Sequence, residues 1–207
     1  HASLNMYREA VKAFDKALGI EKNYAEVYFH KGCALANLGR HEDAIIAFNK
    51  NIDMDAGNAQ AFYHKGLSLV ATGRQKDAID AFDRVSQIIP RSVEAWLHRG
   101  MALAELGSYN DAIEAYMKTL EIDPANADAW YLTGTALFAL AGYKDAIEAL
   151  NKALEIRPVF VSAFYLKGRA LFELGMDEDA IMSYDNALAS DPKHLEALYH
   201  KGIALTQ

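Results

Sequence analysis

Residues 93–126 read VEAWLHRGMALAELGSYNDAIEAYMKTLEIDPAN, and this stretch decides the fold because the whole chain repeats it. Within the unit a glycine, an alanine and a proline each recur at a step of 34 residues. The three columns are Gly32, Gly66, Gly100, Gly134, Gly168 and Gly202; Ala10, Ala44, Ala78, Ala112, Ala146 and Ala180; and Pro90, Pro124, Pro158 and Pro192. A fixed period of this length predicts a repeat architecture, in which each unit buries its apolar face on its neighbours.

The repeating unit is expected to contain two helices. Trp96, Gly100 and Leu103 fall at i, i+4 and i+7, which is one stripe of an α-helix. A second helical stripe runs over residues 112–120, and Pro124 ends it because the residue before a proline avoids the α region. A glycine inside a helix costs roughly 0.5–1 kcal/mol relative to alanine. We therefore expect the second helix to lie close against the glycine column, with the alanine column facing it.

These motifs resemble the tetratricopeptide repeat family. The match is W-x-x-x-G-x-x-L in the first helix, G-x-Y-x-x-A-I-x-A-Y in the second, and then D-P, at the period of that family. The resemblance covers essentially the whole chain. It implies an all-α fold, a right-handed superhelical solenoid of stacked antiparallel helix-turn-helix repeats. It also implies a concave groove, lined by the first helices, that holds other proteins or peptides.

The period predicts a single array over residues 1–207. Residues 1–24 match a second helix only, full repeats occupy 25–58, 59–92, 93–126, 127–160 and 161–194, and 195–207 matches a first helix. Neither end has the polar outer face that is typical of terminal repeats. We therefore expect a piece of a longer repeat protein, whose open ends associate between molecules. The side chains expected to lack partners within the chain are Tyr7, Val11, Phe14, Leu198, Ile203 and Leu205.

Residues 127–160 depart from the other repeats in two places. Their turn is Ala141-Gly142, with the glycine displaced by one place from its column. They end on Val159-Phe160-Val161, where other repeats have polar residues. An apolar turn is either a packing variant or an exposed contact. We favour packing, which leaves Phe160 a second-choice interface residue.

Composition argues against several function classes. The net charge is −7 and Lys and Arg do not cluster, whereas nucleic-acid binding needs a basic footprint. The single cysteine, Cys33, excludes an internal disulfide framework and a Cys-rich zinc site, and it weakly favours a reducing, cytoplasmic location. No apolar run approaches the roughly 20 residues that span a bilayer.

Catalytic and cofactor motifs are likewise missing from the sequence. It contains no glycine-rich phosphate loop, no G-x-S-x-G and no H-E-x-x-H. We therefore expect a non-enzymatic interaction scaffold without a cofactor. The alternatives are the interaction portion of a larger enzyme or signalling protein, and an array that assembles through its uncapped ends.

The resemblance places ligand-facing residues at the second, fifth, sixth, ninth, twelfth and thirteenth places of each repeat. Carried onto this chain, the predicted groove residues are Phe29, Tyr63, Leu97, Met101, Tyr131, Thr135, Phe138, Tyr165, Arg169 and Phe172, with His30, His64 and His98 from the sixth place. Tyrosine suits a binding face because it combines apolar area with a hydroxyl. The open alternative is that these residues pack neighbouring first helices together. Aromatics are densest from Tyr131 to Phe172, where Arg169 would hold a carboxylate.

The second place of the repeats indicates the charge of the partner. It is mostly acidic, with Glu26, Glu94, Asp128 and Glu196. Some family members bind chaperone C-termini through a clamp of lysines, asparagines and an arginine, but here the fifth place carries Phe29 or a tyrosine in every repeat except that of Leu97. We therefore predict no such clamp. A protein or peptide segment with an apolar face and some basic residues fits better.

Two further columns need an interpretation. His30, His64, His98 and His200 share the sixth place, and three hypotheses stay open: a solvated histidine near an i,i+4 carboxylate, a pH-sensitive ligand contact, and a metal site. The seventh place carries Lys31, Lys65, Arg99, Lys167 and Lys201. We interpret these cations as structural rather than as a nucleic-acid stripe, because long stems can cover apolar surface while the charge reaches water.

Overall fold

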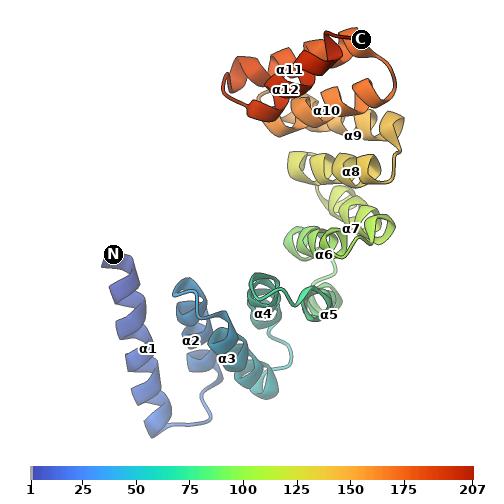
Figure 1. Cartoon of the computed structure of the whole chain (residues 1–207). Helices are drawn as coiled ribbons and strands as arrows, with labels where there is room; N and C mark the ends of the chain where they lie inside the picture. The colour runs from blue at the N-terminus through green and yellow to red at the C-terminus, as the bar shows by residue number, and fades with distance from the viewer. Residues whose placement is uncertain (1) are drawn as a thin grey trace. The chain divides into compact units, whose positions relative to one another are not determined.

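The computed structural model describes residues 2–207, and these form twelve α-helices and no strand (Figure 1). The first helix, α1, spans Ala2–Ile20. The others are α2 (Ala25–Asn37), α3 (His41–Met54), α4 (Ala59–Ala71), α5 (Gln75–Ile88), α6 (Val93–Glu105), α7 (Tyr109–Ile122), α8 (Ala127–Ala139), α9 (Tyr143–Ile156), α10 (Val161–Glu173), α11 (Asp177–Ser190) and α12 (Leu195–Ala204). The predicted all-α repeat fold is confirmed. We call the even-numbered helices A helices and the odd-numbered ones B helices.

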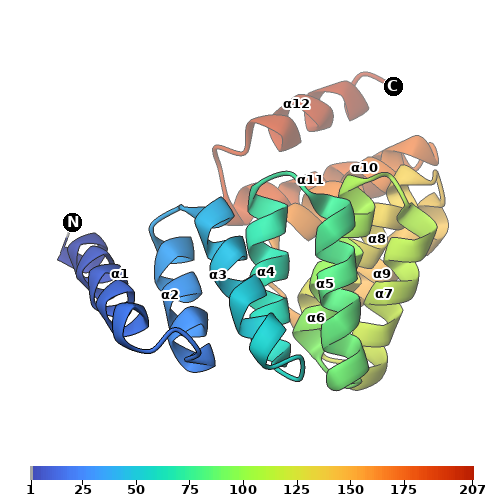
Figure 2. The same ribbon diagram turned by 90° about the horizontal axis from the view of Figure 1, so that it is seen from below.

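The chain divides into two compact units, which are described separately. Unit 1 extends to Leu106 and holds α1–α6, and unit 2 begins at Gly107 and holds α7–α12. In each unit the helices follow one another in chain order, and each packs on its neighbours in sequence (Figures 1 and 2). An inner A helix such as α4 or α10 is therefore flanked by the B helix of its own repeat and by that of the preceding repeat.

The A helices end in a tight turn whose last residue has a left-handed backbone. Gly39, Gly73, Gly107 and Gly175 adopt φ between +71° and +77°, which glycine tolerates because it has no Cβ. Ala141 takes the same place with φ +58°. Its turn also keeps the same hydrogen bonds, from Ala141 N to Phe138 O and from Gly142 N to Leu137 O, each 2.9 Å. The displaced glycine therefore does not displace the turn, and alanine occupies a conformation that suits glycine.

The glycine column in the A helices makes room for a side chain of the following B helix. A Cβ added at Gly66 would lie 2.6 Å from the Phe82 ring, and one at Gly134 would lie 2.8 Å from Leu150. Gly32 and Gly168 meet Phe48 and Tyr184 at 2.6 and 2.5 Å. The predicted close approach of the second helix is therefore present, and at Gly134 the carbonyl oxygen of Ala146, from the alanine column, lies 3.3 Å from the added Cβ. The closest contact is made by the ring or leucine four residues further along the B helix.

The N-terminal end is better covered than expected. Val11 is only 8% exposed and belongs to a core cluster with Leu35 and Phe48, against which Tyr7 and Phe14 are partly buried. The prediction that these three residues lack partners within the chain is therefore wrong, because α2 packs on that face of α1. At the other end, Leu198 and Leu205 are 48% and 64% exposed, while Ile203 is half-buried.

Candidate functional site

The predicted groove residues at the fifth and sixth places take part in a repeated cluster of three rings. In unit 1, Tyr63 of α4 lies 6.0 Å from Phe82 of α5 and 5.5 Å from His98 of α6, measured between ring centroids. Phe82 and His98 are 5.8 Å apart. The fifth place of one repeat, the central ring of its B helix and the sixth place of the next repeat therefore meet at one junction.

The same arrangement recurs wherever the B helix carries a ring and a histidine follows. Phe29, Phe48 and His64 form it in unit 1, with His64 5.8 and 6.0 Å from the two phenylalanine rings. In unit 2, His200 lies 5.8 Å from Tyr165 and 6.3 Å from Tyr184. These distances suit aromatic packing. The histidine column therefore packs rings together across repeat junctions, a role that none of the three hypotheses had included.

Burial changes the acid–base properties of these histidines. It lowers the pKa of His64, and it lowers the pKa of His200 with a further contribution from the positive charge of Arg169. His30 is more exposed and lies 3.7 Å from the carboxylate of Glu26, which is the i,i+4 contact that the solvated interpretation expected. Across residues 2–207 no three His, Cys, Asp or Glu side chains converge as metal ligands would.

Unit 1 carries a pocket next to this cluster. Its volume is about 330 Å³, and it lies between the N-terminal ends of α4 and α6 and the segment before α6. Tyr63 and His64 line it together with Glu94, and the remaining lining residues are Ala59, Gln60, Val85, Ile89 and Ser92. Ile89 is 47% exposed. Val85, Ile89 and Ser92 were not predicted, because they come from the B helix and the loop rather than from an A helix.

The pocket joins an apolar wall to a carboxylate. Burial raises the pKa of Tyr63, and the negative charge of Glu94 raises it further, so the phenol stays protonated at neutral pH. The Tyr63 hydroxyl lies 3.5 Å from Nδ1 of His98. The site therefore offers ring and aliphatic surface, a phenol hydroxyl and one acidic side chain.

Glu94 differs from the other second-place acids in its partners. Asp128 accepts two hydrogen bonds from Arg157, of 2.8 and 2.9 Å, and this contact lowers the pKa of Asp128. Glu26 and Glu196 lie within 3.7 and 3.3 Å of His30 and His194. Within the described part of the chain Glu94 makes no ion pair, and its carboxylate accepts only a 3.4 Å hydrogen bond from the Ser92 hydroxyl. It is therefore the second-place acid most available to a cation from outside.

Unit 2 brings together only part of the predicted aromatic stretch. The Arg169 guanidinium lies 5.2 Å from the centre of the Phe138 ring and 3.5 Å from the Tyr165 hydroxyl. Phe172 is half-buried on the same helix, α10. Tyr131, in contrast, packs against Phe160 with ring centroids 4.8 Å apart. Arg169 is thus held between two rings, while Tyr131 belongs to a separate contact.

Phe160 is a packing residue in this structure. Besides Tyr131, it contacts the Arg157 guanidinium, which lies 4.5 Å from its ring centre and is itself held by Asp128. This agrees with the packing interpretation of the apolar turn.

The remaining predicted groove residues differ in exposure. Leu97 and Phe29 are half-buried, whereas Met101 and Thr135 are exposed, and the Thr135 hydroxyl donates to the carbonyl of Tyr131 at 2.9 Å.

Three other sequence features can now be placed. Cys33 is half-buried, and burial raises the pKa of its thiol. Three of the seventh-place cations make ion pairs with the preceding B helix, as the structural interpretation expected: Lys31 with Asp15, Arg99 with Asp83 and Lys201 with Asp185. Among the described helices, none is long and apolar enough to cross a bilayer.

Comparison with known families places the sequence among helical repeats. Two models of the tetratricopeptide repeat match residues 25–58 and 60–92. A third model, for subunit 3 of the anaphase-promoting complex or cyclosome, matches residues 105–187. No curated protein matches the sequence.

Solved structures share the fold. YrrB, described as a TPR protein with an unusual peptide-binding site, is 23% identical with a TM-score of 0.79, and the match covers 93% of this chain and 99% of that one. A crystal structure of MamA is 26% identical with a TM-score of 0.76, covering 78% and 95% of the two chains. MamA from Desulfovibrio magneticus RS-1 is 20% identical with a TM-score of 0.77, covering 83% and 97%.

Proposed function

The chain belongs to the tetratricopeptide repeat family, and from that premise we propose that it is a non-enzymatic scaffold that binds a segment of another protein on its A helices. The observation that carries the proposal is the 330 Å³ pocket of unit 1, which Tyr63, His64 and Glu94 line together. A pre-formed pocket on rigid helices limits the entropy that is lost on binding.

The lining of the pocket specifies the chemistry of the ligand. An apolar side chain would bury against Val85, Ile89 and the face of Tyr63. A neighbouring lysine or arginine would pair with Glu94, for which no cation competes within the described part of the chain. We therefore propose a protein segment in which a large apolar residue stands beside a basic one, in keeping with the net charge of −7.

Peptide selection tests this proposal. Random peptides displayed on phage are selected against the whole chain, and one selected peptide is measured by fluorescence anisotropy. We expect the selected sequences to pair an apolar with a basic residue. Glu94→Gln should weaken binding by about tenfold, because it removes one charge-assisted hydrogen bond. Tyr63→Ala should weaken it similarly by removing the wall of the pocket.

A matched control distinguishes the effect of the pocket carboxylate on affinity from the effect of the net charge of the protein. Glu114→Gln removes one exposed carboxylate from the B helix α7, outside the pocket, and should leave the affinity unchanged. Selected peptides without a basic residue, or equal affinity for the wild type and both pocket variants, would contradict the proposed site. A Tyr165→Ala, Phe172→Ala double variant tests whether the A-helix face of unit 2 contributes as well.

The exposed end of unit 2 favours a second function, association between copies. A Cβ added at Gly202 meets no atom within 4 Å in the described structure, whereas the equivalent space at Gly168 is filled by Tyr184. Leu198, Tyr199 and Leu205 are 48–64% exposed around it. Light scattering over a range of concentrations tests this function. A Leu198→Glu, Leu205→Glu variant should abolish any concentration-dependent increase in mass, and a wild type that stays monomeric at millimolar concentration would exclude it.

A further inference from the structure

Ion pairs across the repeat junctions follow a rule with one informative exception in unit 1. An aspartate of the B helix neutralises the seventh-place cation of the next A helix: Asp15 lies 2.6 Å from Lys31, and Asp83 lies 2.6 Å from Arg99. Between them, at the junction of α3 and α4, the aspartate is replaced by Asn49. Lys65 therefore faces an amide where Lys31 and Arg99 face a carboxylate, and no ion pair of Lys65 is present among the described residues.

A pocket opens at this junction. Its volume is about 450 Å³, and α3, α4 and α5 line it with Asn49, Lys65, Phe62, Leu69 and other residues. The apolar surface open to a ligand in this pocket is that of Ile46 on α3, which is 60% exposed, because Phe62 and Leu69 are buried. Lys65, which has no ion pair among the described residues, thus lines the same pocket as exposed apolar surface.

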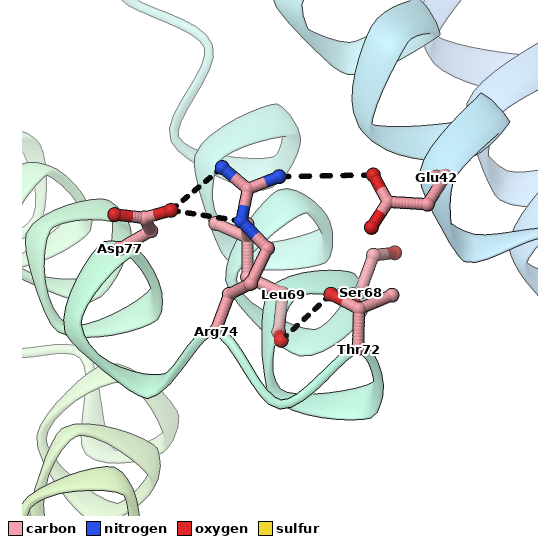
Figure 3. Close-up of polar contacts among 6 residues, drawn as sticks. All are labelled: Glu42, Ser68, Leu69, Thr72, Arg74 and Asp77. Atoms are coloured by element: carbon pink, nitrogen blue, oxygen red, sulfur yellow. Dashed lines mark hydrogen bonds and ion pairs between the residues drawn. The ribbon is translucent and has the colours of Figure 1, made fainter.

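Two arginines at the rim of the pocket already have contacts within the protein. Arg74 donates to Asp77 through Nε and Nη2, at 2.8 and 2.6 Å, and its Nη1 lies 3.7 Å from Glu42 on α3 (Figure 3). Arg84 lies over the Phe62 ring at 5.6 Å and donates to Gln87. The Arg74 guanidinium therefore has carboxylate partners, whereas neither Arg84 nor Lys65 makes an ion pair with any described residue. Of these two, Lys65 is the one whose equivalents at the neighbouring junctions pair with the aspartate that Asn49 replaces.

Charges of both signs line the pocket, and Lys65 is the group in it that would bind a carboxylate. Burial lowers the pKa of Lys65 and the positive charge of Arg74 lowers it further, which is the direction expected of an ammonium group that lacks a close counter-ion. The carboxylates of Asp77, Asp53 and Asp80 act in the opposite direction. An incoming carboxylate at hydrogen-bond distance would replace the aspartate that the two neighbouring junctions of unit 1 supply internally.

We propose that the α3–α4–α5 pocket of unit 1 is a second docking site, which receives an aspartate or glutamate side chain of a partner protein on Lys65 and a neighbouring apolar side chain on Ile46, the lining residue that is 60% exposed. This site is separate from the Tyr63–Glu94 pocket, because Phe62, Lys65 and Leu69 form a different stripe of α4. It also selects the opposite charge. A negative result for this second docking site would therefore not contradict the function proposed for the A-helix face.

A blocked dipeptide provides a direct probe. Acetyl-Glu-Leu-amide has one carboxylate and one apolar side chain, and acetyl-Gln-Leu-amide is the same molecule without the charge. Binding is followed by NMR through the Cε–Hε signal of Lys65 in the whole chain, which is assigned from its disappearance in Lys65→Gln. We expect saturable shifts of this signal with the glutamate dipeptide, and at least about tenfold weaker binding of the glutamine dipeptide.

The decisive variant introduces a carboxylate within the protein that competes with the dipeptide for Lys65. Asn49→Asp gives this junction the residue that the neighbouring junctions have, so the new carboxylate should pair with Lys65 and abolish binding of the dipeptide. Asn151→Asp adds the same charge at the equivalent place in unit 2 and should leave binding unchanged. Loss of binding in Lys65→Gln, read from other signals of the pocket, is a second expected result. Equal binding of the two dipeptides, or undiminished binding to Asn49→Asp, would overturn the proposal.

Discussion

The hydroxyl of Tyr184 is buried without a hydrogen-bond partner among the described residues, although its ring fills the space above Gly168. Burial raises the pKa of this phenol to about 12. The equivalent residues Phe48 and Phe82 fill the same space without a hydroxyl. Because an unpaired buried hydroxyl costs about 1–3 kcal/mol, we expect Tyr184→Phe to raise the free energy of unfolding by on the order of 1 kcal/mol. Urea denaturation measures the change.

The converse substitution is the control for Tyr184→Phe. Phe82→Tyr places a hydroxyl in the same setting in unit 1 and should lower the free energy of unfolding by a similar amount. If Tyr184→Phe proves destabilising, the hydroxyl has a partner, such as a water molecule, and the argument from an unpaired group is wrong.

Ala141 carries the second prediction at the scale of single residues. Its φ of +58° lies in the left-handed region, which costs a residue with a Cβ about 1–2 kcal/mol. We expect Ala141→Gly to raise the midpoint of thermal unfolding, because glycine adopts this backbone without strain. Gly175 has φ +71° and open space around it, so Gly175→Ala should lower the midpoint by a comparable amount. An unchanged midpoint in both variants would count against backbone strain at this turn.

At the scale of helix pairs, the contact between A-helix glycine and B-helix ring is the principal packing feature. Gly66→Ala brings a methyl group to 2.6 Å from the Phe82 ring, so α4 and α5 must separate or the ring must turn. Overpacking of this kind costs about 1–3 kcal/mol, even though alanine is the better helix former. Gly202→Ala meets no neighbour in the described structure and should be neutral or stabilising by less than about 1 kcal/mol. Equal effects of the two substitutions, measured by chemical denaturation, would contradict this account.

The packed histidines make the helix junctions sensitive to acid. Burial lowers the pKa of His64 in the folded state below the value of about 6.5 that it has when unfolded. Between these two pKa values the unfolded chain binds more protons than the folded chain, so the free energy of unfolding increases with pH. The contribution of His64 to stability is therefore lost as the pH falls from about 6.5 through the folded pKa. Stability measured against pH should show this loss.

Substitution of His64 tests its share of the acid sensitivity. Leu166 occupies the same place in unit 2, where the B-helix residue is Leu150, so leucine is compatible with this position. We expect His64→Leu to flatten the pH dependence between about pH 7 and pH 5, with His200 accounting for part of what remains. A slope identical to that of the wild type would show that His64 is not the responsible group.

At the scale of the whole molecule, stability should vary along each unit. Repeat arrays hold together through contacts between neighbouring helices, so a helix with one covered face opens more easily than an inner one. The glycine contact of α12 is empty, whereas Gly168 on α10 is covered by Tyr184. We expect amide hydrogens of α12 to exchange at least about tenfold faster than those of α10 in hydrogen–deuterium exchange mass spectrometry. Equal protection of α12 and α10 in the whole chain would contradict this prediction.

Much of the architecture follows from the sequence by itself. The period of 34 residues, the glycine inside each A helix and the proline after each B helix predict paired helices of the observed type, because they depend only on local backbone preferences and on helical spacing. The histidine column also had a signal in the sequence. A ring stands 16 residues before each histidine, as in Phe48 and His64, whereas Leu150 precedes Leu166. That pairing joins two repeats, so an interpretation of each repeat separately missed it.

Only the tertiary structure decided which charged and aromatic side chains already have partners within the protein. Asp128 and Glu94 hold the same place in their repeats, yet Arg157 binds the first and no cation binds the second within the described residues. Likewise Lys31 and Lys65 are equivalent in sequence, but within the described residues only Lys31 makes an ion pair with an aspartate. Such differences depend on side chains that meet across helix junctions. The repeat pattern specifies those junctions, but the contacts at each one depend on distances and directions in three dimensions.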